Sequence, residues 1–180
     1  RYLERLLAAN PAVITLAELD HPFTAARMQS ELETAGISDD SSLGRALRRL
    51  RQRVMARLIC RDLSGRASLD EVVTTVTDLA EVTIRTAVER LHRDLAAVHG
   101  EPRGATDQKT QQLHVVGMGK LGGAELNASS DIDLVLVYPE EGDTDGARPL
   151  SNHEFFTRLA RRLINALNEW TEDGFVFRVD

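Results

Sequence analysis

The sequence has 180 residues, of which 42% are hydrophobic, enough to bury one sizeable core or two small ones. Its formal net charge of −6 argues against a protein that attracts nucleic acid through an overall basic field. One cysteine, Cys60, excludes a disulfide framework within the chain and suits a reducing compartment. No apolar run approaches the roughly 20 residues that span a bilayer. We therefore expect a cytoplasmic protein that contacts neither membrane nor nucleic acid.

Both ends of the sequence predict a piece of a longer protein. Arg1 stands where a methionine would begin a complete chain, and Asp180 ends a segment in which apolar and polar residues still alternate. We therefore expect further parts that the 180 residues do not contain.

The first part of the chain predicts short helices. Residues 1–9 form one candidate, which stops before Pro11 because proline disfavours helix in the residue that precedes it. Residues 23–35 form a second candidate, which ends at Gly36.

Two longer amphipathic helices are expected next. Residues 42–62 carry leucine and valine at every third or fourth position, and Gly65 breaks the pattern. Ser68 and Glu71 then match a capping box, and an apolar face continues from there to Gly100. At 1.5 Å per residue this helix would be roughly 45 Å long, so we expect it to pack against the helix before it.

Seven arginines crowd the helix expected at 42–62. The default interpretation is a solvated face with acidic partners one turn away. The alternative is a docking surface for acidic partners or for the rest of the protein. These residues are Arg45, Arg48, Arg49, Arg51, Arg53, Arg57 and Arg61.

After a polar, glycine- and proline-bearing linker at 100–110, the apolar pattern changes to a period of two. Residues 113–116 and 132–138 predict two strands. The second is almost continuously apolar, so we expect it to be buried on both faces.

The last part of the chain begins with an acidic surface loop at 139–149. Ser151 and Glu154 match a second capping box, which opens an amphipathic helix. Gly174 ends this region, and residues 175–180 are expected to resume a strand.

The remaining reactive side chains are expected to be structural. His114 has no cysteine or histidine partner at ligand spacing, so we expect it to pack within the strand layer. Cys60 is interpreted as a small core residue and Trp170 as core or helix-end packing. The other histidines on helices or caps are expected at the surface: His92, His99 and His153.

The glycine-rich stretch at 117–122 matches the G-x-G-x-x-G pattern of dinucleotide-binding proteins. Nine residues separate Gly122 from Ile132, whereas a parallel crossover usually needs a dozen or more. We therefore expect the two strands to be antiparallel neighbours, which argues against a dinucleotide site. A P-loop is also absent, because Leu121 follows Lys120 where the motif has Ser or Thr.

An acidic pair opens the second strand. Asp131 and Asp133 are two residues apart, so on a strand their carboxylates point to the same side. Oxygen ligands of this kind suit Mg²⁺, which one or two carboxylates usually hold together with substrate phosphates. The alternative is that the pair only caps a strand entry on the solvent side. Alternation places Asp180 on one face with Val176 and Arg178, so a third carboxylate is expected to join from a neighbouring strand.

The residues upstream of this pair are expected to hold phosphate groups. Gly122 and Gly123 would let backbone N–H groups approach phosphate oxygens at the start of a short helix. Lys120 adds positive charge, and the hydroxyls of Ser129 and Ser130 add donors.

The glycine pair, the later D-x-D and a single final aspartate resemble the polymerase-β-like nucleotidyltransferase superfamily. More narrowly, GMGKLGGAELNASSDIDLVLVYPE, NHEFFTRLARRLINAL and DGFVFRVD are similar to the glutamine synthetase adenylyltransferase/deadenylylase family. The segment from Ser42 to Glu81 also resembles the one that precedes the catalytic domain in that family.

This resemblance implies an α+β fold in two parts. Residues 1–104 would form a helical module, and residues 105–180 a truncated polymerase-β-like mixed sheet with flanking helices. It also implies that Asp131, Asp133 and Asp180 bind Mg²⁺. Gly122, Gly123 and Ser130 would contact the nucleotide phosphates.

The family carries two homologous catalytic halves. One removes AMP from a tyrosine of glutamine synthetase by phosphorolysis, releasing ADP, and the other attaches AMP from ATP. Gly117-Met118-Gly119 and Ser129-Ser130-Asp131-Ile132-Asp133 resemble the removing half, because the other half typically reads G-Y-G-K-L-G-G and G-S-D-L-D. The implied partners are glutamine synthetase, the PII signal protein, ATP or ADP, and phosphate. The alternatives are a non-catalytic docking module or another Mg²⁺-dependent nucleotidyltransferase.

Overall fold

The computed structural model describes residues 4, 8 and 19–180. The helix expected at 1–9 lies almost entirely outside the described residues. The elements in chain order are α2 (Ala25–Glu33), α3 (Asp40–Leu63), α4 (Leu69–His99), β1 (His114–Gly117), α5 (Gly119–Gly122), β2 (Leu134–Val137) and α6 (Asn152–Asn168). Within this described part, no helix combines the length and the apolar character that crossing a membrane requires.

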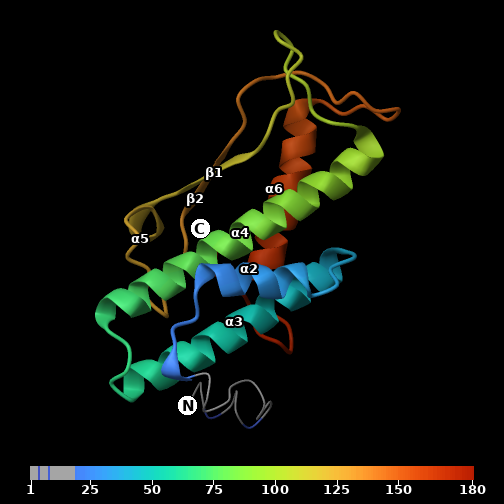
Figure 1. The fold of residues 1–180 in the computed structure, drawn as a ribbon. Coiled ribbons are helices and arrows are strands. Elements are labelled where there is room, and N and C mark those ends of the chain that lie inside the picture. Colours follow the sequence, from blue (N-terminus) through green and yellow to red (C-terminus); the bar gives the residue numbers. More distant parts are fainter. Residues whose placement is uncertain (1–3, 5–7, 9–18) are drawn as a thin grey trace.

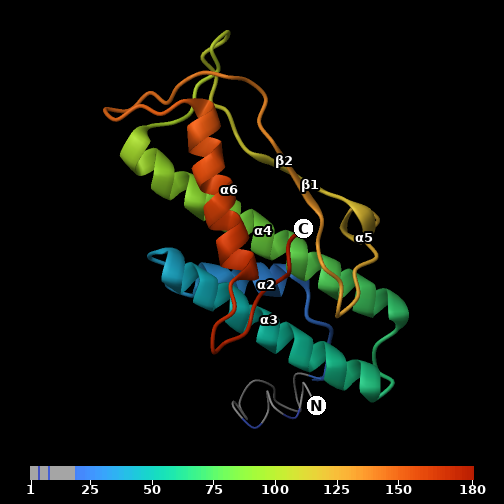
Figure 2. The same cartoon turned by 180° about the vertical axis from the view of Figure 1, so that it is seen from behind.

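The long helix α4 organises the other elements. Figure 1 shows it running across the molecule, with α2 and α3 beside it and α6 crossing it; Figure 2 shows the crossing from behind. Helices α3, α4 and α6 contribute Leu47, Leu79 and Leu163 to one buried core, and none of these side chains is exposed. Helices and a small sheet give the predicted α+β class. The domain division after residue 104 stays a prediction. In the structure, residues from both sides of this division belong to the same core.

Serine caps begin two of the predicted helices. The hydroxyl of Ser68 accepts the N–H of Glu71 at 3.1 Å, and that of Ser151 accepts the N–H of Glu154 at 3.2 Å. The reciprocal bonds of the predicted capping boxes are replaced, because the Glu71 carboxylate binds Arg61 and the Glu154 carboxylate binds an arginine of its own helix.

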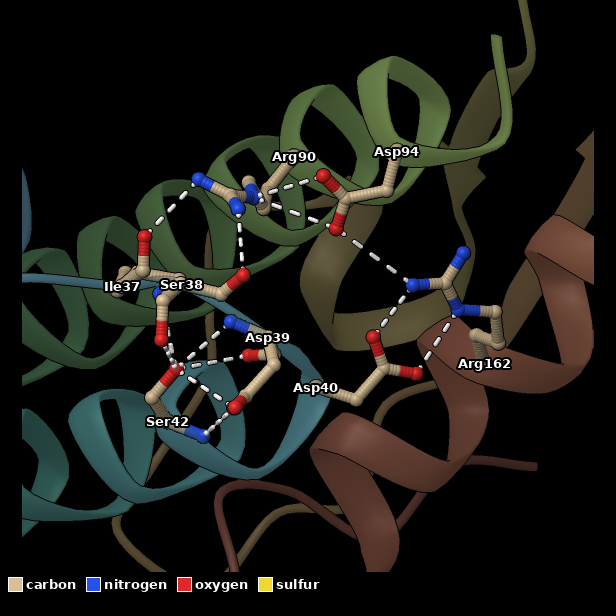
Figure 3. A network of polar contacts seen from close by, with 8 residues as sticks. All are labelled: Ile37, Ser38, Asp39, Asp40, Ser42, Arg90, Asp94 and Arg162. Carbon is tan, nitrogen blue, oxygen red and sulfur yellow. Dashed lines mark hydrogen bonds and ion pairs between the residues drawn. The ribbon is translucent and has the colours of Figure 1, made fainter. Parts of the chain in front are cut away.

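A polar network joins α3, α4 and α6 (Figure 3). Arg162 of α6 donates to the Asp40 carboxylate of α3 at 2.8 Å and lies 3.6 Å from Asp94 of α4. Arg90 of α4 pairs with Asp94 and donates to the carbonyl groups of residues 37–38, just before α3. The Asp40 carboxylate raises the pKa of Arg162. Two arginines and two aspartates thus balance in charge where three helices meet.

Burial of three arginines corrects the expectation that the arginines of α3 form a solvated face. Arg48, Arg57 and Arg61 are only 5%, 3% and 6% exposed, whereas Arg45 and Arg49 are exposed. Two of the buried guanidinium groups donate to backbone carbonyls of the segment before α2. Helix α3 packs against α2, α4 and α6, so little of its circumference reaches solvent.

The two strands pair antiparallel, as predicted, with His114 opposite Val137 and Gly117 opposite Leu134. The expected burial of β2 on both faces is wrong, because Val135 and Val137 are 45% and 44% exposed. The alternate residues of β2 are half-buried against the core.

A segment near the end of the chain pairs with the residues just before β2. Ile132 and Val179 form a parallel bridge. The N–H of Asp180 donates to the carbonyl of Ile132 at 3.0 Å, and the N–H of Leu134 donates to the carbonyl of Asp180 at 3.1 Å. The end of the chain therefore lies beside the acidic pair.

The strand predicted at 175–180 is wrong, because only Val179 forms a bridge there. The N–H groups of Val176 and Phe177 both donate to the carbonyl of Leu167, at 2.9 and 3.0 Å, which ties this segment to the end of α6. Both side chains are buried, so Val176 does not share a face with the exposed Asp180. The sequence pattern could not show this bend, since it depends on the carbonyl of another element.

The loops expected at 100–110 and 139–149 lie against each other, joined by a bridge between Pro102 and Thr144. The Asp145 carboxylate accepts the side chain of Arg103 at 2.8 Å, which lowers the pKa of that carboxyl. Asn152, fully buried, donates its amide to the carbonyl of Arg103 at 2.8 Å. The expected linker is thus held in place.

Several expected packing roles differ from the structure. His114 is exposed rather than packed within the strand layer. His92 and His99 are half-buried, and the Nε2 atom of His92 lies 2.9 Å from a Glu101 carboxylate oxygen. Trp170 is 70% exposed rather than in the core, and its ring lies 4.7 Å from that of Phe175 between centroids, just beyond the end of α6. The partial burial of Cys60 raises the pKa of its thiol.

Candidate functional site

The predicted acidic residues share one face of the sheet. Asp131 and Asp133 are exposed and flank Ile132, whose side chain is fully buried. Residues opposite one another on paired strands project to the same side. The parallel bridge at Ile132 therefore sets Arg178 beside Asp131 and Asp180 beside Asp133, and all four residues are exposed.

One of these carboxylates has a cationic partner that the sequence analysis missed. The Nε of Arg178 donates to Oδ1 of Asp131 at 2.5 Å, and both side chains remain about half exposed. Among the residues that the structure describes, no three Asp, Glu, His or Cys side chains converge closely enough to hold a metal ion. The three aspartates share a face, but Arg178 occupies part of it. The sequence shows only that Arg178 shares a face with Asp180, two residues later; it does not show that Asp131 lies opposite Arg178.

Asp133 is attached to the glycine-rich turn. Its carbonyl accepts the N–H of Met118 at 2.9 Å. Its Oδ2 lies 3.2 Å from the point that a Cβ would occupy at Gly119. The carboxylate thus lies close to the turn that leads from β1 into α5.

The donor set of this face fits a magnesium ion. Mg²⁺ accepts one or two carboxylates and completes its octahedron with water and phosphate oxygens. Asp133 and Asp180 offer two carboxylates side by side. Asp131 lies on the same face, where it pairs with Arg178.

Three positions of the turn require glycine for steric reasons. A Cβ on Gly117 would lie 2.6 Å from the Leu121 side chain, and a Cβ on Gly122 would lie 2.6 Å from the Gly117 carbonyl oxygen. Gly119 has a φ of +52°, which side-chain-bearing residues rarely adopt. The dinucleotide-like pattern therefore reflects the tight packing of β1 against α5.

The N–H groups available to an anion differ from those predicted. The N–H of Gly122 already donates to the Met118 carbonyl at 3.2 Å, and that of Gly123 donates to the Gly119 carbonyl at 3.0 Å. The described residues provide no acceptor for the N–H groups of Gly119 and Lys120. The first N–H groups of any helix lack acceptors within it, which is the signal that could have identified them.

The predicted serines shape the turn before the acidic pair. The hydroxyl of Ser129 donates to the Asn127 side chain at 3.0 Å, and that of Ser130 accepts the Asn127 N–H at 3.1 Å. Lys120 is exposed on α5. These contacts define how the chain enters Asp131.

The neighbouring glycines of the turn should respond differently to alanine. Gly122→Ala forces its Cβ against the Gly117 carbonyl oxygen, whereas at Gly123 the nearest atom would lie 3.5 Å away. We expect Gly122→Ala to destabilise the turn by roughly 1–3 kcal/mol and Gly123→Ala by no more than about 0.5 kcal/mol. Hydrogen exchange on peptides covering β1 and β2 measures this in the full-length protein. Equal exchange in both variants would contradict the steric role of Gly122.

Comparison with known proteins gives one consistent family. A family model described as glutamate-ammonia ligase adenylyltransferase matches residues 1–180. The bifunctional glutamine synthetase adenylyltransferase/adenylyl-removing enzyme of Chromobacterium violaceum is 52% identical over 100% of the chain. Proteins of the same name from Ralstonia nicotianae and Nitrosomonas europaea are 53% and 50% identical over 99% and 100% of it. The match covers 20%, 18% and 20% of these relatives, so the chain spans about a fifth of their length. The chain belongs to the glutamate-ammonia ligase adenylyltransferase family.

Proposed function

We propose that the chain carries the nucleotidyltransferase site that removes AMP from the adenylylated tyrosine of glutamine synthetase. Phosphate is the acceptor and ADP the product. The observation that carries this proposal is the common face of Asp131, Asp133 and Asp180 beside the glycine-rich turn. The names of the relatives, which include both adenylyl transfer and adenylyl removal, support it. The sheet would then be the start of a polymerase-β-like nucleotidyltransferase sheet.

The reaction needs no protein nucleophile. An oxygen of phosphate attacks the α-phosphorus of the adenylyl-tyrosine, the bond to the tyrosine oxygen breaks, and the tyrosine takes a proton. The products are ADP and the free tyrosine. When bound, Mg²⁺ would offset the charge that develops on the phosphoryl oxygens and on the departing phenolate.

The residues of the chain contribute binding and charge. Asp133 and Asp180 would hold the metal, joined by Asp131. The N–H groups of Gly119 and Lys120 would donate to phosphate oxygens, and the Lys120 ammonium would add positive charge. Positioning and electrostatic stabilisation would therefore carry the catalysis, as in phosphoryl transfer generally.

The direction of transfer follows from the motif. Met118 between two glycines and the run Ser129-Ser130-Asp131-Ile132-Asp133 resemble the adenylyl-removing half. The adenylylating half, which uses ATP, would lie elsewhere in the full-length protein. The PII signal protein is the proposed regulatory partner, and the cytoplasm is the proposed location.

An assay of the full-length protein tests the proposal. Adenylylated glutamine synthetase, phosphate and Mg²⁺ should give ADP and unmodified glutamine synthetase, and chelation of the metal should stop the reaction. A protein that binds glutamine synthetase but releases no ADP would instead support a non-catalytic docking module. Transfer of AMP to other acceptors alone would support a different nucleotidyltransferase.

A further inference from the structure

A cleft of about 690 Å³ lies between the start of α3, the end of α6 and the loop that follows α6. None of its lining residues belongs to the glycine-rich turn or to the acidic face of the sheet. The network of Figure 3 borders it, since Asp40 and Arg162 line its wall. The cleft is therefore separate from the proposed catalytic site.

Arg48 lies in this cleft with its guanidinium incompletely satisfied. The residue is 5% exposed, and its Nε and Nη1 atoms are buried and have no hydrogen-bond partner among the residues that the structure describes. The charged group nearest to it is Glu169, whose Oε2 lies 3.7 Å from Nη1 and whose side chain is 65% exposed. A buried donor without an acceptor costs free energy, and most are paired in folded proteins. Arg61, buried in the same helix, binds both oxygens of a carboxylate at 2.6 and 2.9 Å.

The helix makes room for this arginine. A Cβ on Gly44 would lie 3.0 Å from Nη2 and 3.1 Å from Nη1 of Arg48. Glycine inside a helix is less favourable than alanine. Helix α3 therefore accepts a local cost at Gly44, where the guanidinium of Arg48 lies in the space that a side chain would need.

We propose that the cleft binds a small monocarboxylate, whose carboxylate replaces Glu169 as the partner of Arg48. The planar guanidinium fork matches a carboxylate, which can accept two parallel hydrogen bonds. Arg45, one turn earlier on α3, adds a second cation at the mouth. Arg162 is already balanced by Asp40 and Asp94, so it adds no unpaired charge.

The acidic rim decides between a carboxylate and a phosphate. Glu169, Glu172 and Asp173 line the loop side of the cleft. They would repel a phosphate dianion more strongly than a monocarboxylate, although exposure to solvent weakens this repulsion. The amide side chains of Asn165 and Asn168, also in the lining, can donate to the rest of the ligand.

The test compares two substitutions with opposite effects. Binding of acetate and benzoate to the full-length protein is followed by ligand-observed NMR at constant ionic strength. Arg48→Gln should weaken binding at least about tenfold, because it removes a charged hydrogen-bond donor. Glu169→Gln should tighten binding about threefold or more, because it removes the competing carboxylate. In competition with bound benzoate, phosphate should need at least a roughly tenfold higher concentration than acetate to give the same displacement.

The control is Arg49→Gln, which removes an exposed charge from the next position of α3, outside the lining of the cleft. Its affinity should equal that of the wild type. Unchanged affinity in Arg48→Gln, weaker binding in Glu169→Gln, or no carboxylate binding by the wild type would overturn the proposal. If Arg48→Gln does not fold, the exposed Glu169 still gives a decisive variant. None of these residues lies at the proposed catalytic site, so adenylyl removal is tested independently.

Discussion

Asp133→Asn in the full-length protein should abolish adenylyl removal and leave the fold intact. The substitution keeps the side-chain volume and the backbone bond to Met118, but removes the negative charge that would hold the metal. Losing about 4 kcal/mol of charge stabilisation lowers a rate by roughly 1,000-fold. The measurement is ADP release from adenylylated glutamine synthetase at saturating phosphate, with hydrogen exchange of β1 and β2 as the check on folding.

The same variant identifies which half of the protein the chain represents. ATP-dependent adenylylation of glutamine synthetase should stay within about twofold of wild type in Asp133→Asn, because that reaction would use the other half. Asp62→Asn, at an exposed position near the end of α3, is the matched control and should affect neither reaction. Loss of adenylylation alone would assign the chain to the adenylylating half. Retention of adenylyl removal within about tenfold would refute the catalytic role of Asp133.

The helices could be predicted because their signals are local. Periodic leucines marked α3 and α4, and serine hydroxyls at Ser68 and Ser151 cap helices where the sequence indicated. The burial of each side chain was harder to predict, because it depends on which other element packs against it. The β2 sequence LVLV contains only apolar residues, so the sequence does not show which positions are half-buried and which are exposed.

The candidate site shows the same division between local and long-range information. The spacing of Asp131 and Asp133 was sufficient to place both on one face, because alternation along a strand is local. The pairing with Arg178 depends on the register of a segment 47 positions away, which one sequence does not contain. Likewise, the glycines marked a tight turn, but its hydrogen bonds occupy the N–H of Gly122. Within the described part of the chain, the N–H groups of Gly119 and Lys120 are the ones without an acceptor.

The contacts of the buried arginines also depend on distant segments, and they bear on the stability of the fold. Arg61 is the clearest example. Arg61 is 6% exposed, and its guanidinium binds both oxygens of Glu71 and donates to the carbonyl of Leu19. The Glu71 carboxylate raises the pKa of Arg61, so the arginine stays charged. It thereby connects the end of α3 to the first turn of α4 and to the segment before α2.

Arg61→Met should destabilise the fold by about 3–5 kcal/mol, because it leaves the Glu71 carboxylate half-buried without its partner. Arg66→Gln is the matched control in the same turn: its ion pair with Asp20 is exposed, so its loss should cost no more than about 1 kcal/mol. Hydrogen exchange at the α3–α4 junction and thermal unfolding measure both effects.

The double variant Arg61→Met/Glu71→Leu separates the ion pair from the packing of the arginine stem. Removing both charges also removes the unpaired carboxylate, so the double variant should recover at least half of the loss seen in Arg61→Met. Additive losses would instead mean that the bond to the Leu19 carbonyl, rather than the pair with Glu71, holds the junction. Either result would locate the interaction that fixes α4, the helix against which α2, α3 and α6 pack.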